Sequence, residues 1–394
     1  MAAVSKVLED EDLLTEILLR TVFPTTLLKT ALVCTRWLTH ASDRAFLRRF
    51  REIHPPRLLG FYINKGQNTP HFIPILPQPL ELAGVIRRTT SSLGTYQRVP
   101  SVPTYILGCR NGNVLIRQHD KVGITFAAHN VVFPERGMDI LPQFPRPQYQ
   151  YLLDTTYSRI LSKEEGDGLS YLYVLMHQTR DGKHRVYIYI LRHGIWCMNH
   201  ILTIQQPPRP WSVLKSVLSN NKIYVPAGWR NIIVLNLAAS SFSIIELPEG
   251  MEYGERNTIL SQADDVAGVY LIHVKKFQLR IWLHNGYTWL LMDTIYLRGI
   301  CADLSMADGN TSLLINQAGD NAEFVFLDMG RCTFLLDIKC KTMHKVYEKE
   351  DGDNFFCEIH PLMMIWPPVF PTLKDDPTRF VSWPSYNLFV LLWL

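Results

Sequence analysis

The side chains best suited to acid–base or metal chemistry in this chain are its thirteen histidines. His200, His273 and His284 fall near the ends of apolar segments that we expect to form strands. Strand ends can meet at one mouth of a closed ring of sheets, where imidazoles bind a metal ion or transfer protons. Most histidines in such positions satisfy only local hydrogen bonds. We therefore predict neither a metal site nor a catalytic site from them.

Two acidic clusters also contain the residue types of a reactive site. Asp264 and Asp265 are adjacent carboxylates shortly before Gly268, a pattern more typical of a solvated loop. Segment 351–354, Asp-Gly-Asp-Asn, offers the oxygen ligands that calcium prefers. It lacks the ligand spacing and the central glycine of a calcium loop, so we interpret it as the tip of a hairpin.

Common catalytic motifs are missing from the sequence. It contains no G-x-G-x-x-G, G-x-x-x-x-G-K-[ST], H-E-x-x-H or G-x-S-x-G pattern. The cysteines are odd in number, scattered and without a C-x-x-C pair, which predicts reduced thiols and no zinc site. They are Cys34, Cys109, Cys197, Cys301, Cys332, Cys340 and Cys357. The sequence therefore predicts a protein that is not an enzyme and has no cofactor and no bound metal.

Charge and terminal segments indicate the compartment and exclude two classes of partner. The formal net charge of +4 is too small to favour nucleic-acid binding. The N-terminal segment has no apolar signal core, and the apolar run 389–394 is far too short to cross a bilayer. We predict a protein of the cytoplasm, the nucleus or both, with no nucleic-acid partner and no membrane partner.

The first fifty-six residues predict three short helices. Leu13, Leu14, Ile17 and Leu18 repeat at helical spacing, and acidic residues 10–12 precede them, where negative charge suits the helix dipole. Pro24 is expected to stop this helix. Thr25 or Thr26 would then cap a second helix reaching Leu38, and Ser42 or Asp43 would cap a third.

The second of these helices is apolar around nearly its whole circumference. Such a helix must be buried on more than one side. A unit of about fifty residues cannot bury that much apolar surface by itself, because small domains bury too small a fraction of their surface. Part of this surface is therefore predicted to meet either the rest of the chain or another protein.

The pattern changes after Pro55 and Pro56, where we expect a domain exit. Short apolar and aromatic runs then alternate with Gly, Asn, Asp and Pro turns, as in all-β sandwiches, barrels or propellers. Three such runs recur in each of the segments 169–201, 221–247, 267–291 and 312–338. An earlier, less regular unit runs through segments 104–107, 113–117 and 131–133. A repeat of roughly fifty residues favours a kelch-like β-propeller of about six to eight blades over two stacked sandwiches.

The helical segment resembles the F-box of a large plant family. The matching residues are Leu8, Leu13, Leu14, Glu16, Ile17, Leu18, Pro24, Leu27, Leu28, Val33, Cys34, Trp37, Asp43, Phe46 and the run 50–56. Segments 322–327, 347–348 and 359–368 also look like the C-terminal region of this family. The fold class we predict is a multidomain α+β protein, with a three-helix F-box before a mainly antiparallel all-β propeller. The predicted domains are 8–56 (F-box), 57–371 (substrate recognition) and 372–394 (tail).

The resemblance implies a substrate-recognition adaptor of an SCF-type cullin-RING ubiquitin ligase. In that family the F-box docks on the Skp-type linker subunit, and through it on the cullin, while the β-domain recruits a target protein. The residues implied to bind the linker are Leu13, Leu14, Ile17, Leu18, Pro24, Leu27, Leu28, Val33, Cys34, Trp37 and Phe46. Two alternatives stay open. One is a non-ligase interaction scaffold whose helices pack on its own propeller, and the other is a propeller hydrolase.

Overall fold

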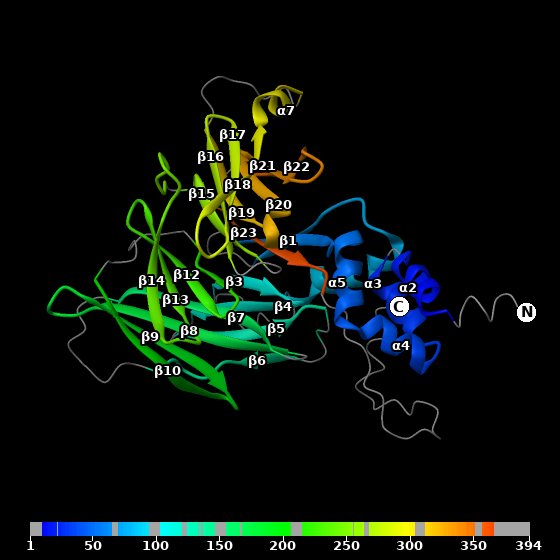
Figure 1. The fold of residues 1–394 in the computed structure, drawn as a ribbon, viewed down its shortest axis with the longest axis horizontal. Helices are drawn as coiled ribbons and strands as arrows, with labels where there is room; N and C mark the ends of the chain where they lie inside the picture. Colours follow the sequence, from blue (N-terminus) through cyan, green and yellow to red (C-terminus); the bar gives the residue numbers. More distant parts are fainter. Residues whose placement is uncertain are drawn as a thin grey trace, which may run out of the picture.

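The computed structural model shows four helices followed by a ring of six β-sheets (Figure 1). It describes residues 10–21, 23–64, 70–93, 103–119, 124–132, 134, 137–145, 155–165, 168–205, 215–254, 256–263, 268–303, 312–350 and 357–365. Within those ranges, no helix is long and apolar enough to cross a membrane. The domain boundaries 8–56, 57–371 and 372–394 remain predictions, and residues 366–394 lie outside the described residues.

The N-terminal helices form a unit that we call the helical unit. Its members are α2 (Glu11–Leu19), α3 (Pro24–Ala31), α4 (Thr35–Ser42) and α5 (Arg44–Ile53). The expected single helix between residues 25 and 38 is wrong, because the chain breaks between Ala31 and Thr35. Cys34 has extended backbone angles, φ −161° and ψ 166°, which no helix accommodates.

Two aspartates cap helices in this unit. The carboxylate of Asp10 accepts hydrogen bonds from the backbone N–H groups of Asp12 and Leu13, and that of Asp43 does the same at the start of α5. These bonds satisfy backbone donors that a helix leaves unpaired at its first turn. The expected threonine cap of the second helix is wrong, because Pro24 is the first residue of α3 and no side chain caps it. Proline suits this position, since its missing N–H would be unpaired there in any case.

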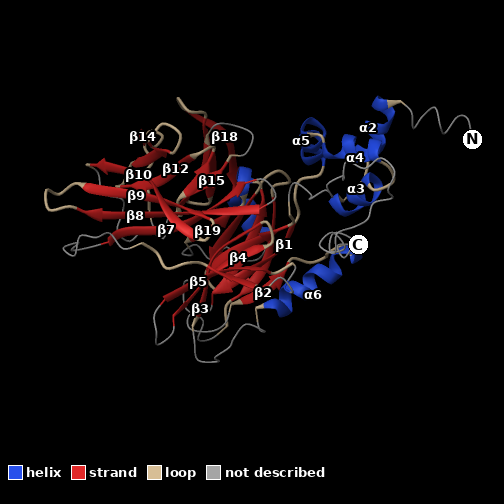
Figure 2. Ribbon diagram, turned by 90° about the horizontal axis from the view of Figure 1, so that it is seen from below, coloured by secondary structure: helices blue, strands red, loops and turns tan. Residues whose placement is uncertain are grey.

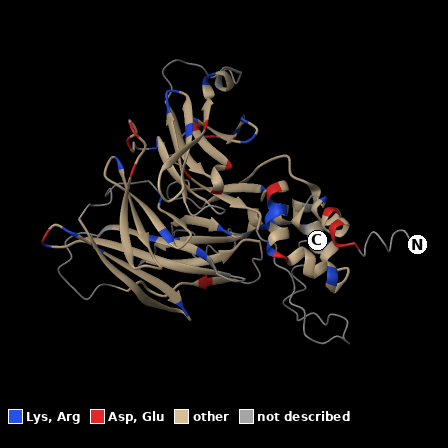
Figure 3. Cartoon of the chain, in the orientation of Figure 1, with Lys and Arg blue, Asp and Glu red and all other residues tan. Residues whose placement is uncertain are grey.

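The helical unit has an apolar core of its own. Its buried members all come from α2–α5: Leu14, Leu18, Leu19, Leu27, Ala31, Leu38, Ala41, Phe46 and Phe50. Figure 3 shows acidic residues at the start of α2 and basic residues along α5. Across these helices, Arg49 donates to the Glu16 carboxylate at 2.5 Å. His54 Nε2 donates to the Leu19 carbonyl oxygen at 2.8 Å. The ends of α2 and α5 are thereby joined.

The remaining chain forms six sheets, each of which we call a blade and number around the ring. Blade 1 contains β23 (Glu358–Met363), β1 (Leu58–Asn64) and β2 (His71–Pro74). Blade 2 contains β3 (Thr104–Arg110), β4 (Asn113–His119), β5 (Ile124–Asn130) and β6 (Met138–Ile140). Blade 3 contains β7 (Thr155–Glu165), β8 (Gly168–Gln178), β9 (His184–Arg192) and β10 (Ile195–Ile204).

The other three blades follow the same four-stranded antiparallel order. Blade 4 contains β11 (Val217–Ser219), β12 (Lys222–Ala227), β13 (Asn231–Asn236) and β14 (Ser241–Glu246). Blade 5 contains β15 (Thr258–Gln262), β16 (Val269–Lys275), β17 (Gln278–His284) and β18 (Trp289–Tyr296). Blade 6 contains β19 (Leu313–Ala318), β20 (Phe324–Met329), β21 (Cys332–Asp337) and β22 (Thr342–Glu348).

The ring is closed by a strand from the far end of the chain. β23 pairs antiparallel with β1, with Phe61 opposite Pro361 and Ile63 opposite Ile359. β23 is the innermost strand of blade 1, and β3, β7, β11, β15 and β19 hold the same place in the other blades. Closure leaves few sheet edges exposed, which removes a route to aggregation.

A helix takes the place of the fourth strand in blade 1. α6 (Ala83–Ser92) follows a 3₁₀ turn (Leu80–Leu82) and packs beside β2 (Figure 2). The hydroxyl of Tyr62 on β1 donates to the Thr89 carbonyl oxygen at 3.2 Å. The predicted propeller was all-β, so both α6 and the short α7 (Leu297–Asp303) correct that expectation.

Each junction between neighbouring blades has its own apolar cluster. The strand β13 shows how this arises, because successive side chains point to opposite faces of a sheet. Ile233 and Leu235 pack toward blade 3, while Ile232 and Val234 pack toward blade 5. A blade buries both faces only when neighbours cover them, which is why the ring must form as a whole.

The propeller predicted from the sequence is confirmed, with six blades. The three predicted runs in segments 169–201 and 221–247 are β8–β10 and β12–β14, the outer three strands of each blade. The innermost strands β7, β11 and β15 were not predicted. In blade 2 the third strand is β5, which ends at Asn130, so the run expected at 131–133 is wrong.

Candidate protein-interaction surfaces and central cavity

The structure divides the predicted linker-binding residues into two groups. Six of the eleven are buried: Leu14, Leu18, Pro24, Leu27, Leu28 and Phe46. Leu14, Leu18 and Leu27 have no exposed side-chain surface at all. Leu14, Leu18, Leu27 and Phe46 belong to the core that holds the helices together, so a partner reaches these four only if the unit rearranges.

The second group lies on the surface of the helical unit. Leu13 and Ile17 are 45% and 39% exposed, and their spacing of four residues places them on one face of α2. Val33, in the break between α3 and α4, is 66% exposed, and Cys34 beside it is exposed too. Trp37 is half-buried against the core. Leu13, Ile17 and Val33 are the surface on which a partner can bury apolar area without unfolding the unit, and we call them the exposed apolar set.

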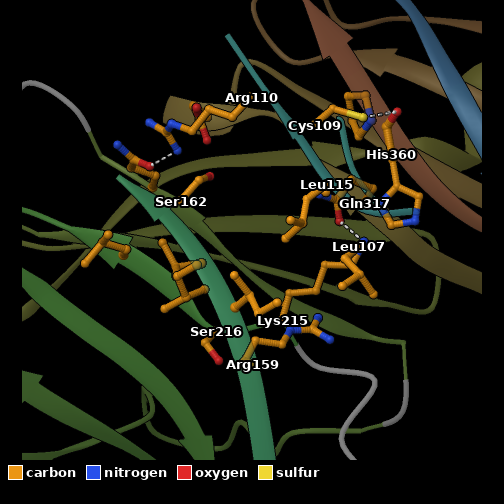
Figure 4. A pocket seen from close by; sticks show the side chains of 18 of the residues that line it. Leu107, Cys109, Arg110, Leu115, Arg159, Ser162, Lys215, Ser216, Gln317 and His360 are labelled. Carbon is orange, nitrogen blue, oxygen red and sulfur yellow. Dashed lines mark hydrogen bonds between the residues drawn. The ribbon is translucent and has the colours of Figure 1, made fainter. Parts of the chain in front are cut away.

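A cavity of about 200 Å³ lies where the innermost strands meet (Figure 4). All six blades contribute to its wall, through residues such as Cys109, Arg159, Lys215, Gln262, Gln317 and His360. Innermost strands converge on the ring axis, so the cavity occupies part of the central channel.

An ion pair between the largely buried Lys215, which lines the cavity, and the partly exposed Glu358 lies at one side of this cavity. Lys215 Nζ lies 3.3 Å from a carboxylate oxygen of Glu358 and donates to Gln317 Oε1 at 2.9 Å. Burial lowers the pKa of Lys215, and Glu358 opposes that shift. Burial would raise the pKa of Glu358, but Lys215 and Arg159 outweigh it and lower this pKa to about 2. Glu358 is therefore ionised at neutral pH, and its carboxylate favours the charged form of Lys215.

His360 completes this wall as a neutral imidazole. Asn64 Nδ2 lies 3.1 Å from His360 Nε2 and donates to it, which assigns the ring proton to Nδ1. Burial is the largest cause that lowers the pKa of His360, to about 3. Asn64 also exchanges two 3.0 Å hydrogen bonds with the backbone of Ile106, so it links blade 1 to blade 2.

The three histidines singled out in the sequence do not converge. His200 Nδ1 bonds to Ser240 at 2.8 Å, and His273 Nδ1 bonds to Thr258 at 2.9 Å. His284 Nδ1 accepts from the Gly286 backbone at 3.2 Å. Burial lowers the pKa of His273 to about 4. In the described part of the chain, no group of three or more His, Cys, Asp or Glu side chains is placed to hold a metal ion. The acidic segments 264–265 and 351–354 lie outside the described residues.

Sequence reasoning missed the charged residues of the cavity. Arg159 lies within the innermost strand β7, and Lys215 lies two residues before the three-residue strand β11. Neither residue lay in a predicted strand, so the sequence pattern gave no signal for them. Their place in one cavity became visible only once the innermost strands were known.

A family model described as "F-box protein AT5G49610-like, beta-propeller" matches residues 105–370. The match covers well over half of the chain and runs from β3 to just beyond β23. The chain belongs to this F-box beta-propeller family. The F-box and propeller resemblance drawn from the sequence is confirmed. The chain is accordingly an F-box protein whose propeller is a protein-interaction domain.

Solved structures share only a distant likeness with this family member. Sqt1 of Saccharomyces cerevisiae is 11% identical with a TM-score of 0.34, and the match covers 65% of this chain and 64% of that chain. Prolyl oligopeptidase B of Galerina marginata is 11% identical with a TM-score of 0.31, covering 60% and 32%. BamB of Moraxella catarrhalis is 8% identical with a TM-score of 0.28, covering 62% and 76%. The chain thus spans less than two thirds of the first two structures. No curated protein matches it.

Proposed function

We propose that this F-box protein is the substrate-recognition adaptor of an SCF-type cullin-RING ubiquitin ligase. The helical unit binds the Skp-type linker subunit, and through it the cullin, while the propeller recruits a target protein. Its role in ubiquitin transfer is positional, because it raises the local concentration of the target near the transferring enzyme. The protein has no catalytic step of its own in this proposal and acts in the cytoplasm, the nucleus or both.

The observation that carries this proposal is the exposed apolar set on a separately packed helical unit. Among the described residues, the core of that unit contains no propeller side chain. The scaffold alternative required Leu14, Leu28 and Trp37 to pack on the β-domain, whereas Leu14 and Trp37 pack in the core of the helical unit. Burying a fully exposed Leu, Ile or Val side chain contributes about 1.5–3 kcal/mol, and because these three are 39–66% exposed, each contributes roughly half of that when a partner covers it.

The topology also places a set of blade turns on the face of the ring away from the helical unit. Consecutive strands of each blade are antiparallel, so their turns alternate between the two faces. The helical unit enters blade 1 at the start of β1. The β8–β9 turn and α7 lie at the other end of the strands, far from α2–α5 (Figure 1). The β12–β13 turn shares that distant face and carries Trp229, which is 66% exposed. Exposed tryptophans are frequent anchors in protein interfaces.

Titration of purified Skp-type linker subunit into the full chain tests the docking claim. We expect the wild type to bind and Val33→Asp to weaken the affinity at least about tenfold, because a charge would be buried in an apolar contact. Ile195→Asp on β10 is the matched control, since Ile195 is also 66% exposed but lies on the propeller. It should bind as the wild type does. Equal affinities for Val33→Asp and the wild type would contradict the proposal.

A further inference from the structure

The cavity in the central channel has more positive than negative charge in and around its wall. Arg110, Arg159 and Lys215 line it, and the neighbouring carboxylates are Asp320 in the wall and Glu358 against Lys215. This is an excess of one positive charge. His360 does not change it, because the imidazole is neutral at ordinary pH.

Arg159 is the group responsible for that excess. Lys215 is satisfied by Glu358, Gln317 and the Ile359 carbonyl oxygen. The Arg159 guanidinium has no hydrogen bond or ion pair with any residue that the structure describes. It still acts electrostatically on Lys215, Glu358 and His360, which places it at this end of the cavity (Figure 4). A half-buried guanidinium that has five donors and no acceptor is a site for an anion.

Ser216 supplies a second group in the same wall without a partner. The residue is 7% exposed, and its hydroxyl oxygen is buried with no hydrogen-bond partner among the described residues. Buried polar groups in native structures are nearly always paired with protein or with bound solvent or ligand. An unpaired hydroxyl and an unpaired guanidinium beside one cavity therefore point to a polar occupant.

The apolar residues of the wall and the volume of the cavity determine what kind of molecule can occupy it. Leu107, Leu115, Leu161, Leu218 and Leu260 line the cavity from four different blades. A volume of about 200 Å³ holds a short aliphatic group together with a carboxylate, but nothing as large as a nucleotide. A single excess positive charge suits a monoanion better than a polyanion.

We propose that the central cavity is a binding site for a monocarboxylate on a short apolar body, held at its charged end by Arg159. Such a group occurs both in a free aliphatic acid and at the C-terminus of a peptide that ends in an aliphatic residue. The site is separate from the helical unit, so it does not depend on whether that unit binds a linker subunit.

Calorimetric titration of the full chain with hexanoate tests the site, with hexanamide as the uncharged analogue of nearly the same shape. We expect hexanoate to bind with a dissociation constant on the order of 1 mM, and hexanamide at least about tenfold more weakly. Arg159→Gln should lose hexanoate binding by a similar factor, and Arg159→Lys should retain most of it. Arg192→Gln, an exposed arginine on the same blade, is the matched control and should bind as the wild type does.

A second pair of probes distinguishes the two sources of the carboxylate. If Gly-Gly-Leu with a free C-terminus binds more tightly than hexanoate, the cavity takes the end of a peptide, and the reverse order identifies a free acid. Either order supports the site, provided that the amidated tripeptide binds more weakly. Equal binding of the charged and amidated probes, or undiminished hexanoate binding by Arg159→Gln, would overturn the proposal. Thermal denaturation of each variant confirms that it is folded.

Discussion

At the scale of single residues, the most consequential polar group is the buried carboxylate of Asp328 in blade 6. Asp328 is 2% exposed and forms ion pairs with Arg256 and with Lys349, the latter at 3.6 Å. Thr333 and Asn316 donate to its two oxygens at 2.7 and 3.0 Å. Since Asn316 also bonds to the backbone next to β23, this network joins blade 5, blade 6 and the closing strand.

Asp328→Asn should lower the free energy of unfolding by about 3–5 kcal/mol, because it removes the carboxylate that two buried cations share. Urea denaturation measures the change. Glu348→Gln is the control, since the Lys345–Glu348 pair is on the surface and its removal should leave the unfolding midpoint unchanged. A loss for Asp328→Asn no larger than that of the control would show that the buried network does not stabilise the ring.

His360 gives the fold a pH dependence of known sign. Its pKa of about 3 is below the ordinary value of 6.5, so the unfolded chain binds a proton between these values and the folded chain does not. The free energy of unfolding should therefore fall as pH is lowered from about 6.5. Glu358, 3.7 Å from His360 Nε2, has a pKa of about 2 and adds a similar loss only below about pH 4.5.

His360→Gln tests this dependence, since a glutamine oxygen can still accept from Asn64 but binds no proton. Between pH 7 and pH 5 the wild type should lose about 2 kcal/mol more than the variant. Urea denaturation at both pH values gives the comparison, in which other buried histidines such as His273 contribute equally to both proteins. Parallel pH profiles would contradict the assignment of a neutral, buried His360.

At the scale of elements, sequence periodicity predicted most outer strands and two innermost ones, β3 and β19, but missed the innermost strands β7, β11 and β15. The outer strands β8–β10 and β12–β14 are long and rich in β-branched and aromatic residues. β11 has only three residues, and β7 carries polar residues toward the cavity, so neither has the apolar pattern of a strand. The α3–α4 break escaped prediction because Leu32, Val33 and Cys34 are as apolar as the helices around them.

The close packing of two neighbouring strands in blade 5 depends on a single glycine, Gly268. A Cβ atom on Gly268, just before β16, would lie 1.9 Å from the His284 carbonyl oxygen on β17. Gly268→Ala should therefore separate these strands and destabilise the protein by about 1–3 kcal/mol. Gly299→Ala in α7 meets no atom within 4 Å and should be neutral or slightly stabilising. Equal thermal midpoints for the two variants would show that blade 5 tolerates the added methyl group.

At the scale of the whole molecule, the chain folds into two units, a helical unit with its own core and a six-bladed propeller. The repeat length was sufficient to predict the propeller, and the resemblance to the plant F-box family implied the F-box before it. They were not sufficient to tell which helical residues face outward, because Leu13 and Leu14 are equally apolar neighbours with 45% and 0% exposure. Only the packing of α2 against the other helices separates them. That packing also reduces the predicted binding surface to Leu13, Ile17 and Val33, with Cys34 and Trp37 at its margin.

The measurement that tests the docking claim most directly is the alkylation rate of Cys34 with and without saturating Skp-type linker subunit. Cys34 is exposed next to Val33, while the exposed Cys197 and Cys340 lie on the propeller and serve as internal controls. Mass spectrometry of the labelled peptides should show Cys34 protected by the linker subunit and the two propeller cysteines reacting as before. If Cys34 reacts at the same rate in both samples, the helical unit does not dock through its exposed apolar set.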